Sequence, residues 1–552
     1  MPLNACRRTR RGRLPHVSRS WVAASAVLGA VLACAASAFP AEPPAPAAES
    51  PPPSVAPENA PSPIPSSSAP VATPPTTAEP SLPSNTTDRE TEATHTIHYQ
   101  LEAIEVRGNS RTRARIIRRF IKIRVGDVFD VENPELELTR FRLLGTGFFR
   151  EVNLSLRKGS RRGAVVLVVD VAERNTIVVS DLWMGLSADA DTRGNARPLT
   201  AYAGADVAET NLAGTGITLG AGLGIARDQL ALRARFFDPS FLGTRWMASA
   251  SLLHNEAREF YGNRDVLYDD PANAAETVQD YAVVKYRRFG GTIGVGRDLS
   301  LPMQLWLDYR LERVNATLPL AASHRRGLDI EPIEFGLNPG PSVLSTLRGT
   351  FQHDTRDMPV LTTRGNFTTV TADISLSPLG SSYPYHKLTV NASQWFELPW
   401  RHVLRLNLFA GVVAGYAPIY ERFYVGDFSD FLPNRMLDLN VDRRPAPNFL
   451  GTDIVEVRYG EYAARLQGDY RIRLYRGRRS VYGVDLFGSA GLYGVASRRD
   501  LTDPPRGYRG MARVPVDLTF NVGLLIDTNA GGFTFAFSNV LGFIPVRSEA
   551  RP

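Results

Sequence analysis

The residues best suited to chemistry form a short charged run in mid-chain. Asp354, Arg356 and Asp357 stand close together, and Gly365 follows them. Paired carboxylates are typical of acid–base catalysis, which also requires a reacting partner such as a histidine or an activated nucleophile. No such partner pattern accompanies this run, and Arg356 can instead form an ion pair with either neighbouring carboxylate.

Known enzyme signatures are also missing from the rest of the chain. The sequence contains no G-x-S-x-G, no H-E-x-x-H and no Walker loop. Its two cysteines, Cys6 and Cys34, lie near the N-terminus, which leaves the remainder without a thiolate ligand or a cysteine nucleophile. We therefore expect a protein that is not an enzyme and that has no cofactor and no metal site.

Two further turns have a distinctive composition. The first begins at Asn211 and contains Gly214 and Gly216. It is not a dinucleotide-binding loop, because the third glycine is misplaced and no βαβ unit follows. The second turn is formed by Asp238 and Pro239, a pair that favours turn initiation.

The segments between such turns alternate between apolar and polar residues. In one of them, Leu305, Leu307 and Leu311 alternate with polar residues that include Arg310 and Glu312. A period of two is typical of strands with one apolar face. No apolar run approaches the roughly 18 residues of a membrane-spanning helix. A soluble sandwich alternates in the same way, but the 378 residues from 175 to 552 fit a closed all-β transmembrane barrel of about sixteen antiparallel strands.

The N-terminus indicates secretion. Residues 1–38 combine six arginines within the first twenty positions, an apolar run from Trp21 to Cys34 and the small residues Ala36-Ser37-Ala38, as in a signal peptide. Lipidation at Cys34 is an alternative, because the residues before it loosely resemble a lipobox. Without those arginines the net charge of +7 falls to near +1, so we expect no nucleic-acid partner.

Two segments separate the signal peptide from the predicted barrel. Residues 39–97 are dominated by Pro, Ala, Ser, Thr and Glu, a composition that predicts a disordered linker. Residues 98–174 predict a small α+β domain in the order β-α-α-β-β. Its expected elements are a strand at Leu101–Val106, a helix from Arg113 to Ile121, a helix from Pro134 to about Leu144, and a hairpin of Val152–Leu156 and Val165–Val171.

These two regions together resemble a known family. Residues 98–174 resemble a POTRA domain, the polypeptide-transport-associated module, and residues 175–552 resemble the bacterial surface antigen barrel of BamA/TamA-type proteins. Three turns resemble the NLxGxG, DPxFxG and DTRD motifs of that barrel, and a fourth segment resembles the start of its long sixth loop. The residues that carry these motifs are Asn211, Gly214 and Gly216; Asp238 and Pro239; Asp354, Arg356, Asp357 and Gly365; and Phe423, Tyr424 and Gly426.

The resemblance ends further along the sixth loop. In the family, a loop arginine in a VRGF or VRGY tetrapeptide meets an aspartate on a following strand inside the barrel. Here the nearest arginine, Arg435, comes three positions late, and Ser489 stands where the aspartate is expected. Asp485 lies on the same predicted strand face and can replace that aspartate. A shifted ion pair and the loss of the pair therefore both remain open.

The resemblance implies a location in the outer membrane, with the POTRA domain in the periplasm. It also implies assembly of outer-membrane proteins or translocation of polypeptides, with clients captured by strand addition to a POTRA sheet edge and with lateral opening of the barrel. Candidate edges are Leu101–Val106 and Val165–Val171. The implied partners are outer-membrane lipid, unfolded β-barrel or secreted polypeptide clients, and periplasmic or lipoprotein accessory subunits. The alternative is a passive channel or structural barrel that keeps the fold without assembly activity.

Overall fold

The computed structural model describes one continuous region of the chain with a few short gaps. The predicted signal peptide (1–38), the predicted linker (39–97) and the last residues (537–552) lie outside the described residues. Within the described part, no helix is long and apolar enough to cross a membrane. The described residues are 99–536 without 130–133, 191–194, 263–265, 270–275, 280, 320–321, 433, 455–458 and 478.

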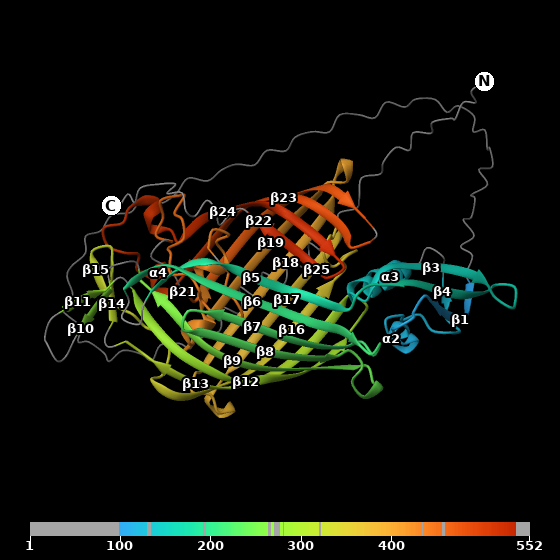
Figure 1. Ribbon diagram of the computed structural model, residues 1–552, viewed down its shortest axis with the longest axis horizontal. Helices are drawn as coiled ribbons and strands as arrows, with labels where there is room; N and C mark the ends of the chain where they lie inside the picture. The colour runs from blue at the N-terminus through green and yellow to red at the C-terminus, as the bar shows by residue number, and fades with distance from the viewer. Residues whose placement is uncertain are drawn as a thin grey trace, which may run out of the picture. The chain divides into compact units, whose positions relative to one another are not determined.

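The N-terminal domain is a four-stranded sheet packed against two helices (Figure 1). The strand order is β2-β1-β4-β3, with β1 and β4 parallel. Apolar residues from both helices, Ile117 and Leu143, join Leu167 and Val169 of the central strand in one core. The elements are β1 (Tyr99–Arg107), α2 (Ala114–Arg119), β2 (Val128–Phe129), α3 (Pro134–Gly145), β3 (Phe149–Lys158) and β4 (Ala164–Glu173).

The predicted elements of this domain are present, with small shifts in their bounds. Helix α2 is shorter than the predicted span, and the two-residue strand β2 was not predicted. Helix α3 begins at Pro134, where the fixed φ and the missing N–H of proline are tolerated.

One of the two predicted docking edges is wrong. Val165–Val171 lies in β4, which pairs with β1 on one side and with β3 on the other. Strand β1 pairs with β2 only at Tyr99 and Gln100. Among the described residues, the sheet edges without a paired strand are therefore β3 and the part of β1 beyond Leu101. An alternating sequence cannot reveal this, because it specifies which face a residue occupies and not which strand lies beside it.

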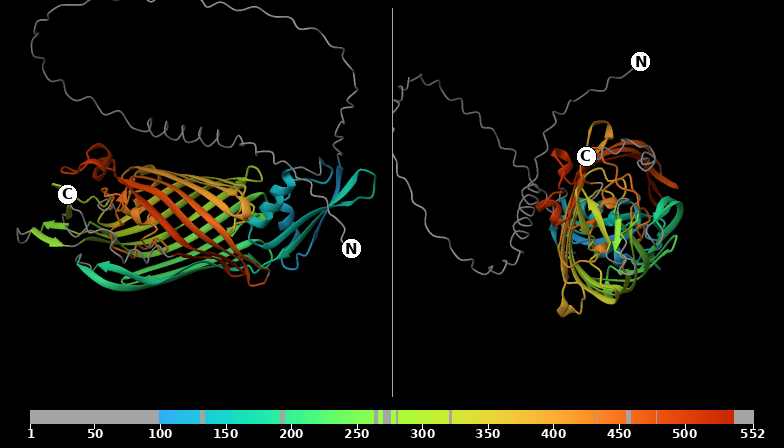
Figure 2. Two further views of the ribbon diagram at one scale, coloured as in Figure 1. Left: turned by 90° about the horizontal axis from the view of Figure 1, so that it is seen from above. Right: turned by 90° about the vertical axis from the view of Figure 1, so that its left-hand side faces the viewer.

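The remainder of the chain folds into an antiparallel sheet that curls into a barrel. The sheet has 15 strands in the described residues, against the predicted number of about sixteen. Its strands run side by side at a common tilt (Figure 2). They are β5 (Ile177–Ala190), β6 (Ala196–Leu212), β7 (Ile217–Ala226), β8 (Gln229–Asp238), β9 (Trp246–Tyr261), β12 (Ala282–Asp298), β13 (Met303–Thr317), β16 (Gly340–Asp354), β17 (Gly365–Ser375), β18 (Tyr385–Glu397), β19 (Val403–Gly415), β22 (Tyr462–Arg476), β23 (Val481–Ala496), β24 (Val516–Thr528) and β25 (Gly531–Ala536).

The two faces of the barrel wall follow the predicted alternation. On β13, Leu305, Leu307 and Leu311 face outward and are 48%, 50% and 49% exposed, whereas the side chains of Arg310 and Glu312 face the lumen and are buried. An outward apolar face is what lipid requires, and a polar lumen is typical of such barrels.

A tryptophan and an arginine contact each other on the outer face of the barrel wall, at the end near the N-terminal domain. Trp246 of β9 pairs across the ladder with Arg297 of β12, and the guanidinium of Arg297 lies 5.2 Å from the centre of the indole ring. Tryptophan and arginine gather where a bilayer meets water. We therefore place one membrane boundary at this pair of residues.

The opposite end of the barrel is covered by a second, smaller sheet. Its strand order is β11-β10-β14-β15, and helix α4 (Arg498–Thr502) follows β23 at the same end (Figure 1). The buried side chain of Arg326 contacts Glu331, Asp453 and Asp500. This cluster ties three separate segments together. The strands are β10 (Val266–Asp269), β11 (Glu276–Gln279), β14 (Ala322–Arg326) and β15 (Asp329–Pro332).

Candidate functional site

The barrel lumen is occupied by the long loop between β19 and β22, residues 416–461, which we call the lumen loop. Many of its side chains are buried and join one apolar cluster with the inner wall, including Ile419, Tyr424, Val425 and Leu439. Short elements give the loop a defined path. They are η4 (Ile419–Glu421), β20 (Phe423–Tyr424), η5 (Val425–Asp427) and β21 (Tyr459–Gly460).

The predicted start of the sixth loop lies in this lumen segment. Phe423 and Tyr424 form β20, and Gly426 lies in the next turn. The ring of Phe423 packs against Phe409 of the wall with 5.9 Å between ring centres. The wall leaves room for that ring through Gly411, where a Cβ atom would overlap the ring.

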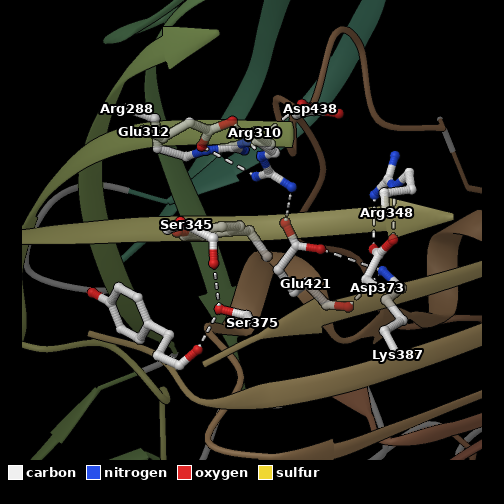
Figure 3. A network of polar contacts seen from close by, with 12 residues as sticks. Arg288, Arg310, Glu312, Ser345, Arg348, Asp373, Ser375, Lys387, Glu421 and Asp438 are labelled. Atoms are coloured by element: carbon white, nitrogen blue, oxygen red, sulfur yellow. Dashed lines mark hydrogen bonds and ion pairs between the residues drawn. The ribbon is translucent and has the colours of Figure 1, made fainter. Parts of the chain in front are cut away.

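An acidic residue that sequence reasoning missed fixes the beginning of the lumen loop. Glu421 Oε1 accepts a hydrogen bond of 2.8 Å from Arg310 of β13, and Glu421 Oε2 lies 3.5 Å from Lys387 Nζ of β18. Lys387 also donates to the backbone oxygen of Glu421 at 2.8 Å. Figure 3 shows Glu421 between these two wall cations.

The cations of the wall are themselves paired with acids. Glu312 receives hydrogen bonds from Arg310 and from Arg288, whose Nε lies 2.8 Å from Glu312 Oε2. Arg288 also lies 3.7 Å from Asp438, which comes from a later part of the lumen loop. The pair Arg348 and Asp373 lies beside this network in Figure 3, at 2.7 Å. Because positive and negative side chains alternate, the buried network carries little net charge.

The electrostatic effect on Glu421 follows from this geometry. Burial alone favours a raised pKa for Glu421, but the guanidinium of Arg310 and the ammonium of Lys387 outweigh burial and hold its pKa well below its usual range. Glu421 is therefore ionised, and the two wall cations stay paired. The lumen loop is thus attached to the wall by a buried ionic contact.

Arg435 lies inside the lumen, but its partners differ from the expected one. Its guanidinium lies 5.1 Å from the ring centre of Tyr424 and 5.9 Å from that of Tyr459. It donates to the backbone oxygen of Tyr420 at 3.0 Å, and its Nε lies 3.9 Å from Asp427. Stacking on aromatic rings suits a buried guanidinium, because the ring faces are negative.

Asp485 does not pair with Arg435. Asp485 accepts a hydrogen bond of 2.5 Å from Arg476 and lies 3.9 Å from Arg471, all within adjacent strands of the wall. Ser489 is buried, and its hydroxyl has no hydrogen-bond partner among the described residues. The shifted pair that the sequence suggested is therefore not formed; Asp485 instead neutralises wall arginines.

The run from Asp354 to Asp357 folds the turn between β16 and β17. Arg356 pairs with Asp354, with 2.8 Å between Nη2 and Oδ2. Asp357 Oδ1 accepts the backbone N–H of Thr363 at 2.9 Å and so closes the loop from the other side. Gly365 has φ +114°, and a Cβ there would overlap the Thr355 carbonyl. The two carboxylates thus hold the turn between β16 and β17 in its conformation.

The glycine-rich turn joins the barrel to the N-terminal domain. Asn211 Nδ2 donates to Thr112 Oγ1 at 2.8 Å, and the N–H of Arg113 donates to the carbonyl of Gly214 at 2.9 Å. Gly214 has φ +70°, and a Cβ there would overlap the carbonyl oxygen of Arg111. Only glycine suits this close approach.

The remaining motif residues support the same junction. The side chain of Asn211 also accepts the N–H of Gly216 at 2.7 Å, and Asp238 Oδ1 accepts the N–H of Ser240 at 2.7 Å. Pro239 lies beside Gly216. Next to these turns is a cleft of about 280 Å³ between the domain and the barrel rim, lined by residues that include Phe120, Phe148, Phe237, Pro239 and Arg356.

The predicted site residues thus lie in three places, and Asp485 and Ser489 belong to the wall strand β23. Phe423, Tyr424, Gly426 and Arg435 belong to the lumen loop, whereas the barrel motifs form the rim beside the N-terminal domain. Sequence reasoning missed Glu421 and its cation partners. The sequence did contain a signal for the cation Arg310. It lies with Glu312 on the polar face of a strand that the apolar–polar alternation had already predicted.

Family models match both folded regions of the chain. The Omp85 superfamily domain matches residues 211–431, and the POTRA model, described as a surface antigen variable number repeat, matches residues 99–174. Among solved structures, the chain is similar to BamA from Haemophilus ducreyi lacking POTRA domains 1–3, with 14% identity, 82% of each chain covered and a TM-score of 0.43. It is also similar to CdiB from Escherichia coli, with 11% identity, 80% of this chain and 72% of that chain covered, and a TM-score of 0.48. A comparison with curated proteins found no match.

A POTRA domain followed by an antiparallel barrel with an apolar outer face defines an outer-membrane β-barrel protein of the assembly and transport class. The chain contains a POTRA domain and an Omp85 superfamily domain, in the order of its two folded regions. These two domains support outer-membrane protein insertion or polypeptide translocation as its general activity.

Proposed function

We propose that this protein assembles β-barrel clients in the outer membrane through an opening between the first and last strands of its own barrel. The observation that carries the proposal is the seam between β5 and β25. No backbone ladder joins these two strands in the described part of the chain, whereas every other neighbouring pair of barrel strands forms one. Unpaired strand edges are templates for another strand.

The seam has contacts at its POTRA end, and β5 contacts the lumen loop at its other end. On the POTRA side, the N–H of Val179 donates to the carbonyl of Ala530 at 2.7 Å, and Arg174 donates to the carbonyl of Thr528 at 2.8 Å. At the other end, the N–H of Arg443, from the lumen loop, donates to the carbonyl of Ala188 at 3.0 Å. The edge of β5 between these contacts spans about eight residues, or roughly 27 Å along the strand at 3.4 Å per residue.

Clients are first captured in the periplasm, on the edge of the POTRA sheet. Strand β3 is the better candidate edge, because it borders only β4. Arg140 Nε donates a hydrogen bond of 3.0 Å to the carbonyl of Val152, so that carbonyl is already paired. In the described structure, Asn153–Lys158 remains as the stretch of β3 that a client can reach. An extended client segment can add to this stretch through main-chain hydrogen bonds.

The alternative of a passive channel has less support. The lumen loop fills the barrel with buried side chains and is attached to the wall by Glu421. A solute would have to displace that loop to pass.

The function is tested with purified protein in liposomes that are offered an unfolded β-barrel client. We expect faster client folding than in empty liposomes, scored by protease protection and heat-modifiable gel mobility. Ion conductance is measured on the same preparation. No acceleration together with steady conductance would contradict the proposal and favour the passive channel.

The capture step makes a separate prediction. A photo-reactive amino acid at Ser155, exposed on β3, is expected to give strong adducts with an unfolded client. The same substitution at Asp170, exposed on the central strand β4, is the matched control, because both edges of that strand are already paired. Equal adduct yields at the two positions would show that strand addition at β3 is not the capture mode.

A further inference from the structure

A strongly basic surface lies on the POTRA domain beside the barrel. From Arg111 to Arg124 the chain has seven cationic residues and no acidic one. We call this stretch, which includes helix α2, the basic segment. Its apolar residues Ile116 and Ile117 are buried in the domain core, so the charges are left on the surface. The exposed cations are Arg111, Arg113, Arg115, Arg118, Lys122 and Arg124.

The basic segment is fixed to the turn between β8 and β9. Arg119 donates to the carbonyl of Thr244 at 2.8 Å and to that of Arg245 at 3.2 Å. This turn immediately precedes Trp246, which marks the membrane boundary on the POTRA side. The basic segment is thus held at the level where phospholipid headgroups lie.

The turn itself presents apolar side chains to the surroundings. Phe241 is 41% exposed and Leu242 is 83% exposed. Leu242 has φ +51°, a left-handed conformation that is unfavourable for a branched side chain. An exposed leucine in a strained turn at the edge of a bilayer is well placed to enter the acyl region, where its burial is favourable.

Within the basic segment, the ion pair that the described residues form is that of Arg119 with Asp298, at 3.7 Å. Asp298 also lies 3.1 Å from Arg142, so it is shared by two guanidinium groups. Burial lowers the pKa of Lys122 most, Asp298 and Glu135 oppose this effect, and Arg142 and Arg245 lower the pKa further. Anionic groups near Lys122 therefore favour its charged form.

We propose that the basic segment and the Phe241-Leu242 turn together bind anionic phospholipids of the membrane leaflet on the POTRA side of the barrel. The headgroup phosphates meet the exposed cations, and the two apolar side chains enter the leaflet. Polybasic segments beside a membrane are attracted to anionic lipid in this way. This contact holds the POTRA domain at a fixed distance from the bilayer. Lipid binding of this kind is separate from the assembly activity proposed above.

The test uses the mature chain in nanodiscs, with an environment-sensitive fluorophore on Leu242→Cys. Residues 35–552 contain no cysteine, so labelling is specific. We expect a blue shift in equal mixtures of phosphatidylcholine and phosphatidylglycerol, and a smaller shift in phosphatidylcholine alone. Salt weakens the shift, because it screens exposed charges.

The decisive comparison uses two charge-matched triple variants. The first variant combines Arg115→Gln, Arg118→Gln and Lys122→Gln, which removes two arginines and one lysine from the basic segment. We expect this variant to need at least about fivefold more phosphatidylglycerol for half the shift, since one basic residue contributes about that factor. The control replaces Lys158, Arg161 and Arg162, which are exposed on the β3–β4 hairpin, with glutamine. Its fluorescence shift should depend on phosphatidylglycerol as that of the unaltered chain does.

Two results would overturn the proposal. In the first, the fluorophore reports the same environment in both lipid compositions, and the charge variant changes nothing. In the second, inorganic phosphate reverses the shift as effectively as removing phosphatidylglycerol, which would indicate a site for free anions and not for a lipid surface. Neither readout depends on client folding, so failure here is distinguishable from failure of the assembly proposal.

Discussion

A disulfide across the seam is expected to lower the rate of client folding by at least about tenfold, which corresponds to about 1.4 kcal/mol of activation free energy. The bond is introduced with Val179→Cys and Ala530→Cys, whose backbones already meet through a 2.7 Å hydrogen bond. Adjacent strands lie about 4.8 Å apart, within the Cα separation that a disulfide tolerates. The locked seam cannot open on the POTRA side, where a client strand would enter.

The measurement compares oxidised and reduced protein in the same liposomes. Reduction is expected to restore the rate, which excludes a general folding defect. A matched control places the disulfide at Thr371→Cys and Thr389→Cys, opposite residues of the closed ladder between β17 and β18. If the oxidised seam variant folds clients as fast as the reduced one, opening between β5 and β25 is not part of the mechanism.

The second large effect concerns the attachment of the lumen loop. Glu421→Gln is expected to destabilise the folded barrel by about 3 kcal/mol, because removing one partner of a buried ion pair leaves the other charge uncompensated. The unpaired groups are Lys387 and, in part, Arg310, which keeps its contact with Glu312. The temperature at which the heat-modifiable band is lost measures this change, and protease cleavage within residues 416–461 reports loosening of the loop.

Two variants separate the ionic effect from general damage. Glu397→Gln changes an exposed glutamate at the end of β18 and should leave the transition unchanged. Adding Lys387→Met to Glu421→Gln removes the stranded cation and should recover part of the stability, as a double-mutant cycle would show. A Glu421→Gln protein with unaltered melting and cleavage would mean that the apolar contacts of Phe423 and Tyr424 alone hold the loop.

The polarity of this attachment is the reverse of the one that the family resemblance implied. There, an arginine of the loop meets an acid of the wall. Here, the loop provides Glu421, and the wall provides Arg310 and Lys387.

Much of the fold follows from local sequence patterns. Alternation at Leu305–Glu312 specifies one face for lipid and one for the lumen, since successive side chains of a strand point in opposite directions. Pro134 and the turn motifs around Gly214 and Asp238 mark the ends of elements, because their backbone preferences are local. These preferences do not depend on distant parts of the chain, so the sequence by itself determined the barrel, the POTRA domain and their order.

Pairing between distant residues was decided only by the tertiary structure. Glu421 and Arg310 are separated by 111 positions, and no local preference brings them together. The same is true of the β3 edge and of the seam, because strand neighbours depend on how the whole sheet closes. Arg435 shows the limit most clearly: its sequence position allowed a pairing with Asp485, but the path of the lumen loop places it between Tyr424 and Tyr459. A buried charge takes the partner that the surrounding packing brings within reach, and only the folded chain determines that packing.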